Sequence, residues 1–415
     1  MPHLSPQLEE SFRRFRSIRS RGGDSMNLRE VSSLLMEASS NSFLRTSLDR
    51  ANLSYWELRK SVFSKYPYLK DLADKVREVK ESSLERMEEL THIAMESVER
   101  NGGFAYLART PDEARRIVDE IVGDGKVIVK GKSITSEELG LREHLASRGK
   151  EVYETDLGEF LVQFIGPKSM HFISVSIHLT RERVAEFLRG FMGEEVDKDD
   201  IEGMVSLVRK FLRRKYFEAD IGMSGVNAFA ADEGCGFIIE NESNVRLSIS
   251  LPRKHIMLVG MEKVLPTMLD AWRAVEVITR YNGYKVSSYV NIVRGPQKDG
   301  FGPRELHVIF LDNGRVESSR DPVLKEALLC LRCGACQYLC PVFWIVGGYW
   351  GGLKSVYSGG IGVIWEYITG SKEEATKHSF ACLLCGRCKE ACPMRIDQQK
   401  ILREIRRRGY SIKAP

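Results

Sequence analysis

The run Cys330-Leu-Arg-Cys333-Gly-Ala-Cys336-Gln-Tyr-Leu-Cys340-Pro341 recurs, with the same cysteine spacing, as Cys382-Leu-Leu-Cys385-Gly-Arg-Cys388-Lys-Glu-Ala-Cys392-Pro393. Both runs follow the pattern C-x2-C-x2-C-x3-C-P, which is typical of bacterial ferredoxins that bind [4Fe–4S] clusters. Eight of the nine cysteines of the chain lie in these two runs. The doubled pattern therefore predicts two four-iron clusters in the C-terminal region.

The fourth cysteine of each run predicts which thiolates share a cluster. In two-cluster ferredoxins the first three cysteines of a run bind one cluster and the fourth binds the other. We therefore expect two ligand sets: Cys330, Cys333, Cys336 and Cys392 for one cluster, and Cys382, Cys385, Cys388 and Cys340 for the second. A small residue inside each run, Gly334 and Gly386, lets backbone amides turn toward the sulfurs.

Three other uses of these cysteines fit the sequence less well. Disulfides require an oxidising compartment, and no secretory signal is recognisable. Zinc sites use paired C-x2-C motifs and do not require a third cysteine two residues later, followed by C-P. Buried structural cysteines have no reason to recur at a duplicated spacing. The cluster interpretation is therefore the one that the pattern favours.

Length, composition and charge indicate an ordinary soluble protein of two or three domains. The chain has 415 residues, of which 43% are hydrophobic and 29% are charged. Its net charge of +5 is small and spread over 62 basic and 57 acidic residues, so nucleic acid is not an expected partner. No apolar run is long enough to span a bilayer. Thiols and clusters favour the cytoplasm, or the inner face of a membrane; peripheral membrane association stays open.

The pattern of apolar residues predicts three regions, with boundaries near 100 and 315. Residues 1–100 show helical periodicity, residues 101–315 alternate between strands and helices, and residues 316–415 hold the cysteine runs. Such alternation is typical of an α/β domain with a largely parallel sheet. The strands are expected at 104–107, 127–130, 152–155, 161–165, 237–240, 255–260 and 306–311.

Polar residues at the carboxyl ends of these strands form a candidate binding site. In parallel α/β sheets the ligand crevice lies at that edge. Lys132 and Ser133 follow one strand and Glu137 lies in the next helix, while Asp232, Glu233 and Gly234 occupy a turn before a buried strand. A lysine beside helix-start amides favours a carboxylate or a phosphate. The alternative is that Lys132 and Glu137 form only a surface ion pair.

Five short segments resemble the lactate-utilisation (LUD) domain. They are Gly131-Lys-Ser-Ile-Thr-Ser-Glu-Glu138, Glu154-Thr-Asp-Leu-Gly-Glu159, Ala219-Asp-Ile-Gly222, Glu240-Asn-Glu242 and Asp312-Asn-Gly-Arg315. With the cysteine runs after them, the chain is similar to iron–sulfur proteins of the LutB/LldF type over roughly residues 50 to 400. The resemblance implies a domain of the sugar-phosphate-isomerase/CoA-transferase-like type, fused to a helical two-cluster ferredoxin domain. The chain departs from the family pattern at Asp232-Glu-Gly-Cys235, Ser169-Met-His171 and Ser176-Ile-His178. These departures leave the ligand of the LUD domain, and hence the substrate, open, and they do not touch the cluster cysteines.

The resemblance implies an electron-transfer subunit of an oxidoreductase complex that oxidises L-lactate or a related 2-hydroxy acid. Its implied partners are a cysteine-rich subunit of heterodisulfide-reductase character and a second LUD-domain protein. The chain has no G-x-G-x-x-G joining a strand to a helix, so a hydride acceptor such as a flavoprotein dehydrogenase is expected elsewhere. The alternatives are a different electron donor, including a thiol/disulfide system, and a metabolite-binding module whose clusters sense redox state.

Two features outside the main motifs have ordinary explanations as well as functional ones. Cys235, the ninth cysteine, fits a small core residue better than a reactive thiol. Residues 342–367, between the cysteine runs, are rich in aromatic residues and glycine. We expect these aromatics to shield the clusters from water, and a partner surface or a quinone-sized groove is the alternative.

Overall fold

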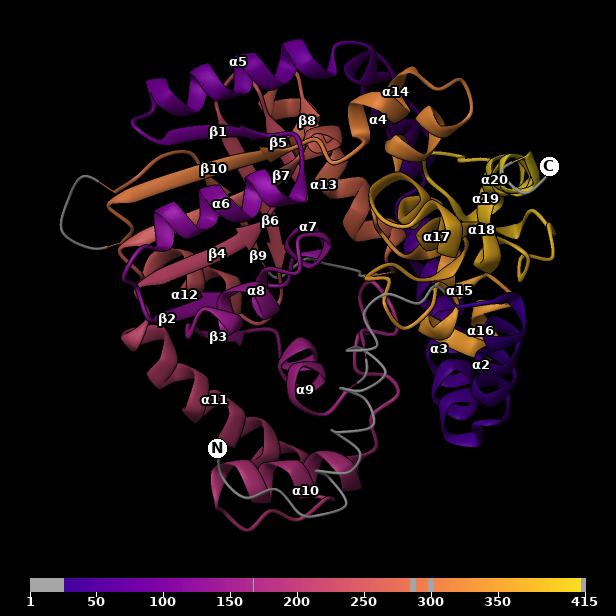
Figure 1. Cartoon of the computed structure of the whole chain (residues 1–415), viewed down its shortest axis with the longest axis horizontal. Coiled ribbons are helices and arrows are strands. Elements are labelled where there is room, and N and C mark those ends of the chain that lie inside the picture. The colour runs from indigo at the N-terminus through magenta and orange to yellow at the C-terminus, as the bar shows by residue number, and fades with distance from the viewer. Residues whose placement is uncertain (1–25, 167, 284–288, 298–301, 412–415) are drawn as a thin grey trace.

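A computed structural model describes residues 26–166, 168–283, 289–297 and 302–411 (Figure 1). Residues 1–25 of the predicted helical region lie outside the described part. The rest of that region is helical: α2 (Leu28–Ser40), α3 (Ser42–Lys65), α4 (Leu69–Glu85) and α5 (Met87–Arg100). None of the described helices is both long enough and apolar enough to cross a membrane.

The centre of the α/β part is a six-stranded sheet in which every neighbouring pair is parallel. Its strand order is β1 (Phe104–Ala108), β10 (Glu305–Leu311), β7 (Lys254–Gly260), β4 (Ile221–Gly225), β2 (Val127–Lys130) and β3 (Glu151–Glu154). The inner strands β7 and β10 are buried along nearly their whole length. Such continuous apolar strands are what a sheet covered on both faces requires. The largely parallel sheet is thus confirmed.

A smaller sheet stands beside the first and has mixed pairing. Its order is β8 (Val264–Leu265), β5 (Ala228–Ala230), β6 (Cys235–Glu240) and β9 (Tyr289–Val293). The predicted strand 237–240 belongs to this sheet, where it pairs antiparallel with both neighbours. Helix α13 (Met268–Tyr281) packs against β5 and β6 on one side and against α4 on the other. The α/β part therefore has two sheets joined by a shared core.

Local capping signals fix several of the connecting helices. Thr110 accepts a hydrogen bond from the Glu113 amide and Pro111 occupies the first turn, so α6 (Pro111–Val122) begins where the sequence predicts. The other connecting elements are α7 (Ile134–Glu138), α8 (Leu141–Ser147), α9 (Leu157–Ile165), α10 (Arg181–Met192), α11 (Ile201–Glu218), α12 (Asn244–Ser250) and the 3-10 turn η1 (Met261–Lys263).

The predicted strand at 161–165 is wrong, because these residues form the second half of α9. Asp156 caps this helix by accepting a hydrogen bond from the Glu159 amide, at 2.9 Å. The apolar residues are spaced so that one helical face, with Phe160 and Ile165, is buried. A short apolar segment fits either a strand or a helix, and here the helix cap upstream favours the helix.

The cysteine-rich region consists of short helices connected by tight turns. They are α14 (Arg315–Arg320), η2 (Leu324–Leu329), α15 (Ala335–Tyr338), α16 (Phe343–Val346), η3 (Gly347–Tyr349), α17 (Gly359–Thr369), α18 (Lys372–Ser379), α19 (Arg387–Ala391) and α20 (Gln398–Ser411). Between the cysteine runs, Trp350, Tyr357 and Trp365 are fully buried. These three rings therefore form core around the cysteine runs and not an exposed surface.

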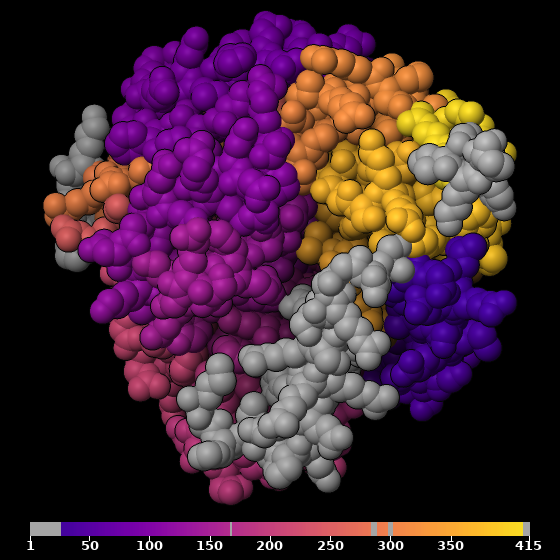
Figure 2. All heavy atoms as spheres, viewed as in Figure 1, coloured from indigo at the N-terminus to yellow at the C-terminus, as the bar shows by residue number. Residues whose placement is uncertain are grey.

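The N-terminal helices contact both of the other regions. Helices α2 and α3 pack against α16, whereas α4 and α5 pack against α13 and β1 of the α/β part. Figure 2 shows the N-terminal atoms, in indigo, directly beside the C-terminal region, in yellow. Tyr55 of α3 stacks on Tyr338 at 4.3 Å between ring centroids and donates a hydrogen bond to the Tyr281 carbonyl. These helices therefore join the two regions rather than project as an arm.

Candidate metal centres and the adjoining cavity

The two cysteine runs share one backbone conformation. Arg332 and Leu384, at equivalent positions, both have positive φ angles, of 57° and 56°. Gly334 and Gly386 follow at 77° and 83°, in the region that favours glycine. These turns aim the Arg332 amide at the Cys330 sulfur, at 3.3 Å, and the Leu384 amide at the Cys382 sulfur, at 3.4 Å. The duplicated sequence therefore produces duplicated amide–sulfur contacts, as the spacing predicts.

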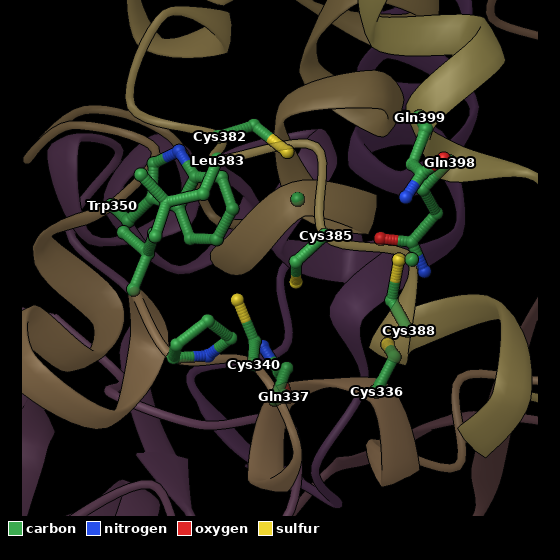
Figure 3. Close-up of a pocket in the computed structure, with 14 residues that line it drawn as sticks. Cys336, Gln337, Cys340, Trp350, Cys382, Leu383, Cys385, Cys388, Gln398 and Gln399 are labelled. Atoms are coloured by element: carbon green, nitrogen blue, oxygen red, sulfur yellow. The ribbon is translucent and has the colours of Figure 1, made fainter.

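Thiols from both runs surround one pocket, which Figure 3 shows in close-up. The pocket is lined by five of them: Cys336, Cys340, Cys382, Cys385 and Cys388. All nine cysteines are free thiols. Within the described residues, no three His, Cys, Asp or Glu side chains stand close enough to share a single metal ion.

The fourth cysteine of each run lies near the first three of the other. Burial raises the pKa of Cys340 to about 12, and the nearby Cys382 and Cys385 thiols add to the rise. Burial likewise raises the pKa of Cys392, and its thiol neighbours are Cys333 and Cys330. Each fourth cysteine therefore has cysteines of the opposite run among its neighbours, and which four thiols share a cluster stays a prediction.

The donor set fits iron–sulfur clusters on chemical grounds. Buried thiols with raised pKa values are poorly placed to ionise alone, and bound metal makes a coordinating thiol lose its proton. Backbone amides from residues 342, 343, 394 and 396 reach the sulfurs of the two fourth cysteines and lower their pKa values, against the effect of burial. Amide donors of this kind tune clusters once they are bound.

The two thiol sets differ in depth. Cys333 is buried, and burial raises its pKa to about 12. Burial also raises the pKa of Cys336 well above its usual value. In the other set Cys385 is exposed. One candidate centre thus lies inside the molecule and the other reaches its surface.

A buried charge network connects the inner set to the α/β part. Arg332 pairs with Glu262 at 2.8 Å, and Arg315 pairs with Glu138 at 2.8 Å and also with Glu262. Burial alone would raise the pKa of Glu262, but the guanidinium groups of Arg315 and Arg332 lower it to about 2. The Arg332 guanidinium also lies 4.3 Å from the centre of the Trp365 ring. This network fixes the first cysteine run against the strand ends.

A cavity of about 540 Å³ lies at the carboxyl edge of the parallel sheet and extends to the first cysteine run. Its walls include Lys132 and Ser133 after β2, Lys263 after β7, and Leu331 and Arg332 from the first cysteine run. The cavity therefore lies where ligands bind in open α/β sheets. Its volume falls in the range usual for small-molecule sites, about 300–1,000 Å³.

Of the predicted crevice residues, only Lys132 and Ser133 line this cavity. The Lys132 ammonium donates to the Ile173 carbonyl at 3.0 Å, and Ser133 caps α7. Glu137 instead pairs with buried Lys130 at 3.0 Å, which also corrects the alternative of a surface pair with Lys132. Helix α7 is a single five-residue turn, too short to offer a helix-end site.

The structure does not bring Asp232, Glu233 and Gly234 into the cavity. They pack against the end of α5, where the Asn101 side chain donates to the Glu233 carbonyl at 2.8 Å. Gly234 has a φ angle of 59°, and a Cβ there would lie 2.6 Å from the Ser97 backbone. A tight approach to α5 therefore explains this glycine turn.

Sequence reasoning missed Lys263, Arg332 and three acidic residues that line the same cavity: Asp156, Glu240 and Glu242. Burial, together with the nearby Arg332 charge, lowers the pKa of Lys263 to about 7. Lys263 lies three residues beyond the end of β7, a position that the strand-end rule could have singled out. Arg332 lies inside a cysteine run, where the spacing of the cysteines indicates a metal site and gives no sign of the cavity.

Cys235 is a core residue. It begins β6, is 1% exposed and faces the main hydrophobic cluster. Burial raises its pKa to about 11, which disfavours the reactive thiolate. The prediction of a small apolar core residue agrees with this environment.

Comparisons with known proteins identify both parts of the chain. Residues 91–311 match the LUD domain, and residues 326–396 match a 4Fe-4S dicluster domain. Lactate utilization protein B 1 of Bacillus mycoides is 36% identical over 80% of this chain and 69% of its own length. Lactate utilization protein B of Bacillus thuringiensis is 32% identical over 87% and 76%. A solved DUF162 family protein from Deinococcus radiodurans covers 54% of this chain and 98% of its own, with a TM-score of 0.32 and 12% identity.

Proposed function

Since the chain belongs to the lactate utilization protein B family, with a LUD domain followed by a 4Fe-4S dicluster domain, we propose that it transfers electrons within a lactate-oxidising complex. It is an iron–sulfur protein with two [4Fe–4S] clusters. When bound, each cluster supplies a site that gains and loses an electron. Oxidation of lactate or another 2-hydroxy acid releases two electrons, which two such sites accept.

The proposed ligands of the inner cluster are Cys330, Cys333, Cys336 and Cys392, and those of the outer cluster are Cys382, Cys385, Cys388 and Cys340. The proximity of each fourth cysteine to the opposite run supports this pairing. Cys336 of the inner set also lines the pocket of the outer set, so the two clusters are neighbours. Adjacent clusters are the arrangement that electron transfer through one small domain needs.

The difference in depth carries the proposed direction of transfer. The inner set adjoins the cavity through Leu331 and Arg332, and the outer set includes the exposed Cys385. Electrons therefore pass between the cavity side and a docked partner by way of the inner cluster and then the outer one. The exposed side chains around the outer set, including Leu383, form the proposed contact with that partner.

The proposed partners follow from the family and from what the chain lacks. A cysteine-rich subunit of heterodisulfide-reductase character and a second LUD-domain protein complete the complex. A flavoprotein dehydrogenase is a further candidate, because hydride chemistry requires an acceptor that clusters do not provide. We propose that the complex works in the cytoplasm, either free or at the inner face of the membrane.

The test combines the purified chain with its candidate partners under anaerobic conditions. Adding L-lactate to the complete mixture should bleach the cluster absorbance and produce the electron-paramagnetic-resonance signals of reduced clusters, and an oxidant should reverse both. Leaving out any one partner should abolish the reduction. If lactate leaves both clusters oxidised in every mixture, while a thiol/disulfide couple or another dehydrogenase reduces them, the donor is different and lactate is not the substrate of this complex.

A further inference from the structure

We propose that the cavity is a site for a small metabolite bearing an oxyanion, held by Lys132, Lys263 and Arg332, and that its occupancy is coupled to the redox state of the inner cluster. The coupling rests on the proposed function, because it requires a cluster on Cys330 and its partners. The binding itself does not. The site is made by the LUD part and the first cysteine run together, so neither part forms it alone.

The two lysines have hydrogen-bonding capacity left for a ligand. An ammonium group has three donors. Lys132 donates to one backbone carbonyl, and Lys263 donates to the Val226 carbonyl at 2.8 Å and weakly to Thr135 at 3.4 Å. Neither ammonium lies within 4.0 Å of a carboxylate oxygen among the described residues, although Glu262 and Glu138 act on Lys263 from further away, and Glu242 is near Lys132. Two lysines on the wall of one cavity, neither in a direct ion pair among the described residues, favour an incoming anion.

Arg332 supplies the third cation and the link to the cluster. It is 8% exposed and lines the cavity; its Nη2 pairs with Glu262 at 2.8 Å and its Nη1 lies 3.5 Å from Glu138, while its Nε donates to no acceptor among the described residues. Buried donors are normally satisfied, and a guanidinium edge matches the two oxygens of a carboxylate or phosphate. The unused Nε donor of this buried arginine is therefore a second, independent indication of an oxyanion site.

The acidic residues of the cavity indicate the rest of the ligand. Asp156, Glu240 and Glu242 line the same space as the three cations. Carboxylates accept hydrogen bonds, so they suit hydroxyl groups on a ligand whose charge is held by the cations. A cavity of about 540 Å³ has room for a hydroxy acid or for a larger sugar-phosphate-like molecule. The shared chemistry is an oxyanion with hydroxyl groups.

The coupling follows from the position of Arg332. Its backbone amide donates to the Cys330 sulfur at 3.3 Å while its side chain faces the cavity. Reduction adds a negative charge to the inner cluster, and a bound oxyanion adds another nearby. The two charges repel, so the oxidised protein should bind the anion more tightly, and binding should lower the potential of the inner cluster by the same free energy. A tenfold ratio of the two dissociation constants corresponds to about 59 mV for one electron.

The test titrates the full chain, with both clusters present, under anaerobic conditions. The probes are L-lactate, pyruvate, ribose 5-phosphate and inorganic phosphate. Calorimetry measures the binding of each probe to the oxidised protein and to the dithionite-reduced protein. We expect at least one organic probe to bind at millimolar concentration or more tightly, and several-fold more tightly in the oxidised protein. Lys132→Met and Lys263→Met should each weaken binding about tenfold, whereas Lys210→Met, on the exposed face of α11, should not.

Redox titration supplies a readout that a purely structural cavity would not change. The bound probe should lower the midpoint potential of one cluster and leave the other nearly unchanged. The proposal is overturned if no probe binds, if the two lysine variants bind as wild type does, or if binding shifts neither potential. Binding and coupling in a protein that lactate and partners cannot reduce would overturn the proposed function and leave this site intact.

Discussion

The two cysteine runs have the same backbone and opposite surroundings. Where the first run has Arg332, buried in a charge network, the second has Leu384, and where the first has the buried Cys333, the second has the exposed Cys385. A duplicated motif thus specifies ligand geometry, while the residues between the cysteines decide what each site faces. One run is built to face the interior and the cavity, and the other to face a partner.

The largest expected effect comes from substituting the fourth cysteine of a run. Cys392→Ser should remove the inner cluster, although it lies in the second run, and should reduce iron from about eight to about four atoms per chain. Cys333→Ser should have the same effect, and the double variant should lose no more iron than either single variant. Cys392→Ser combined with Cys385→Ser should lose both clusters. Iron and sulfide analysis measures these outcomes.

The matched control for these variants is Cys235→Ser, which should keep about eight iron atoms because Cys235 lies in β6 outside both runs. If Cys392→Ser and Cys385→Ser instead affect the same cluster, then each run binds its own cluster and our crossed pairing is incorrect. Recovery of two zinc ions per chain from anaerobically prepared protein would contradict the clusters themselves.

The reciprocal exchange of Arg332 and Leu384 sharpens the comparison. Arg332→Leu leaves Glu262 and Glu138 short of a buried cationic partner, and breaking a buried ion pair costs about 3–5 kcal/mol. Leu384→Arg changes a partly exposed side chain, where effects are within about 0.5 kcal/mol. Thermal denaturation, followed by the loss of cluster absorbance, should show a large drop for the first and almost none for the second. Equal effects would mean that the network does not stabilise the first run.

Because the two clusters differ in solvent access, a chelator should remove their iron at different rates. The outer set contains the exposed Cys385, so an iron chelator should remove four iron atoms several-fold faster than the remaining four. The inner cluster should persist under conditions that strip the outer one. The time course of chelator absorbance measures this, and Cys385→Ser, which lacks the outer cluster, should show only the slow phase. A single phase for all iron in wild type would contradict the difference in depth.

The smallest expected effect concerns the surface beside the outer cluster. Leu383 is 68% exposed and adjoins Cys382, so Leu383→Ser should weaken partner docking by about 1 kcal/mol, or roughly fivefold. Iron content should stay unchanged. Stopped-flow rates of electron exchange with the cysteine-rich partner measure the effect, with Leu58→Ser on α3 as an exposed control. Identical rates for both variants would place docking elsewhere.

Sequence reasoning succeeded where one short segment contains the whole signal. The cysteine spacing, the Thr110–Pro111 cap and the continuous apolar strands β7 and β10 depend on neighbours within a few residues, and each predicted its local structure. The segment 161–165 was misread because a five-residue apolar run fits a strand and a helix equally, and the deciding cap at Asp156 lies outside it.

The cavity could not be predicted in full, because its charged wall combines residues that are far apart in the chain. Lys132, Lys263 and Arg332 belong to three segments that only the tertiary fold brings together. The opposite case is a predicted site that lies outside the cavity, the glycine turn at Asp232, Glu233 and Gly234. Its sequence resembles a binding loop, but its conformation allows close packing against α5. Topology supplies the edge of a sheet where ligands bind, and packing decides which side chains reach it.

The N-terminal helices impose an order on biosynthesis. Arg77 of α4 donates to the Met394 carbonyl across 317 positions of sequence, and Trp344 donates to Asp49 across 295. Contacts between such distant positions slow folding, because the intervening chain must be ordered before they form. The first helices leave the ribosome long before the cysteine runs that complete their packing. The packing of these helices is therefore completed late, and a truncated chain would expose an unfinished helical surface to chaperones and proteases.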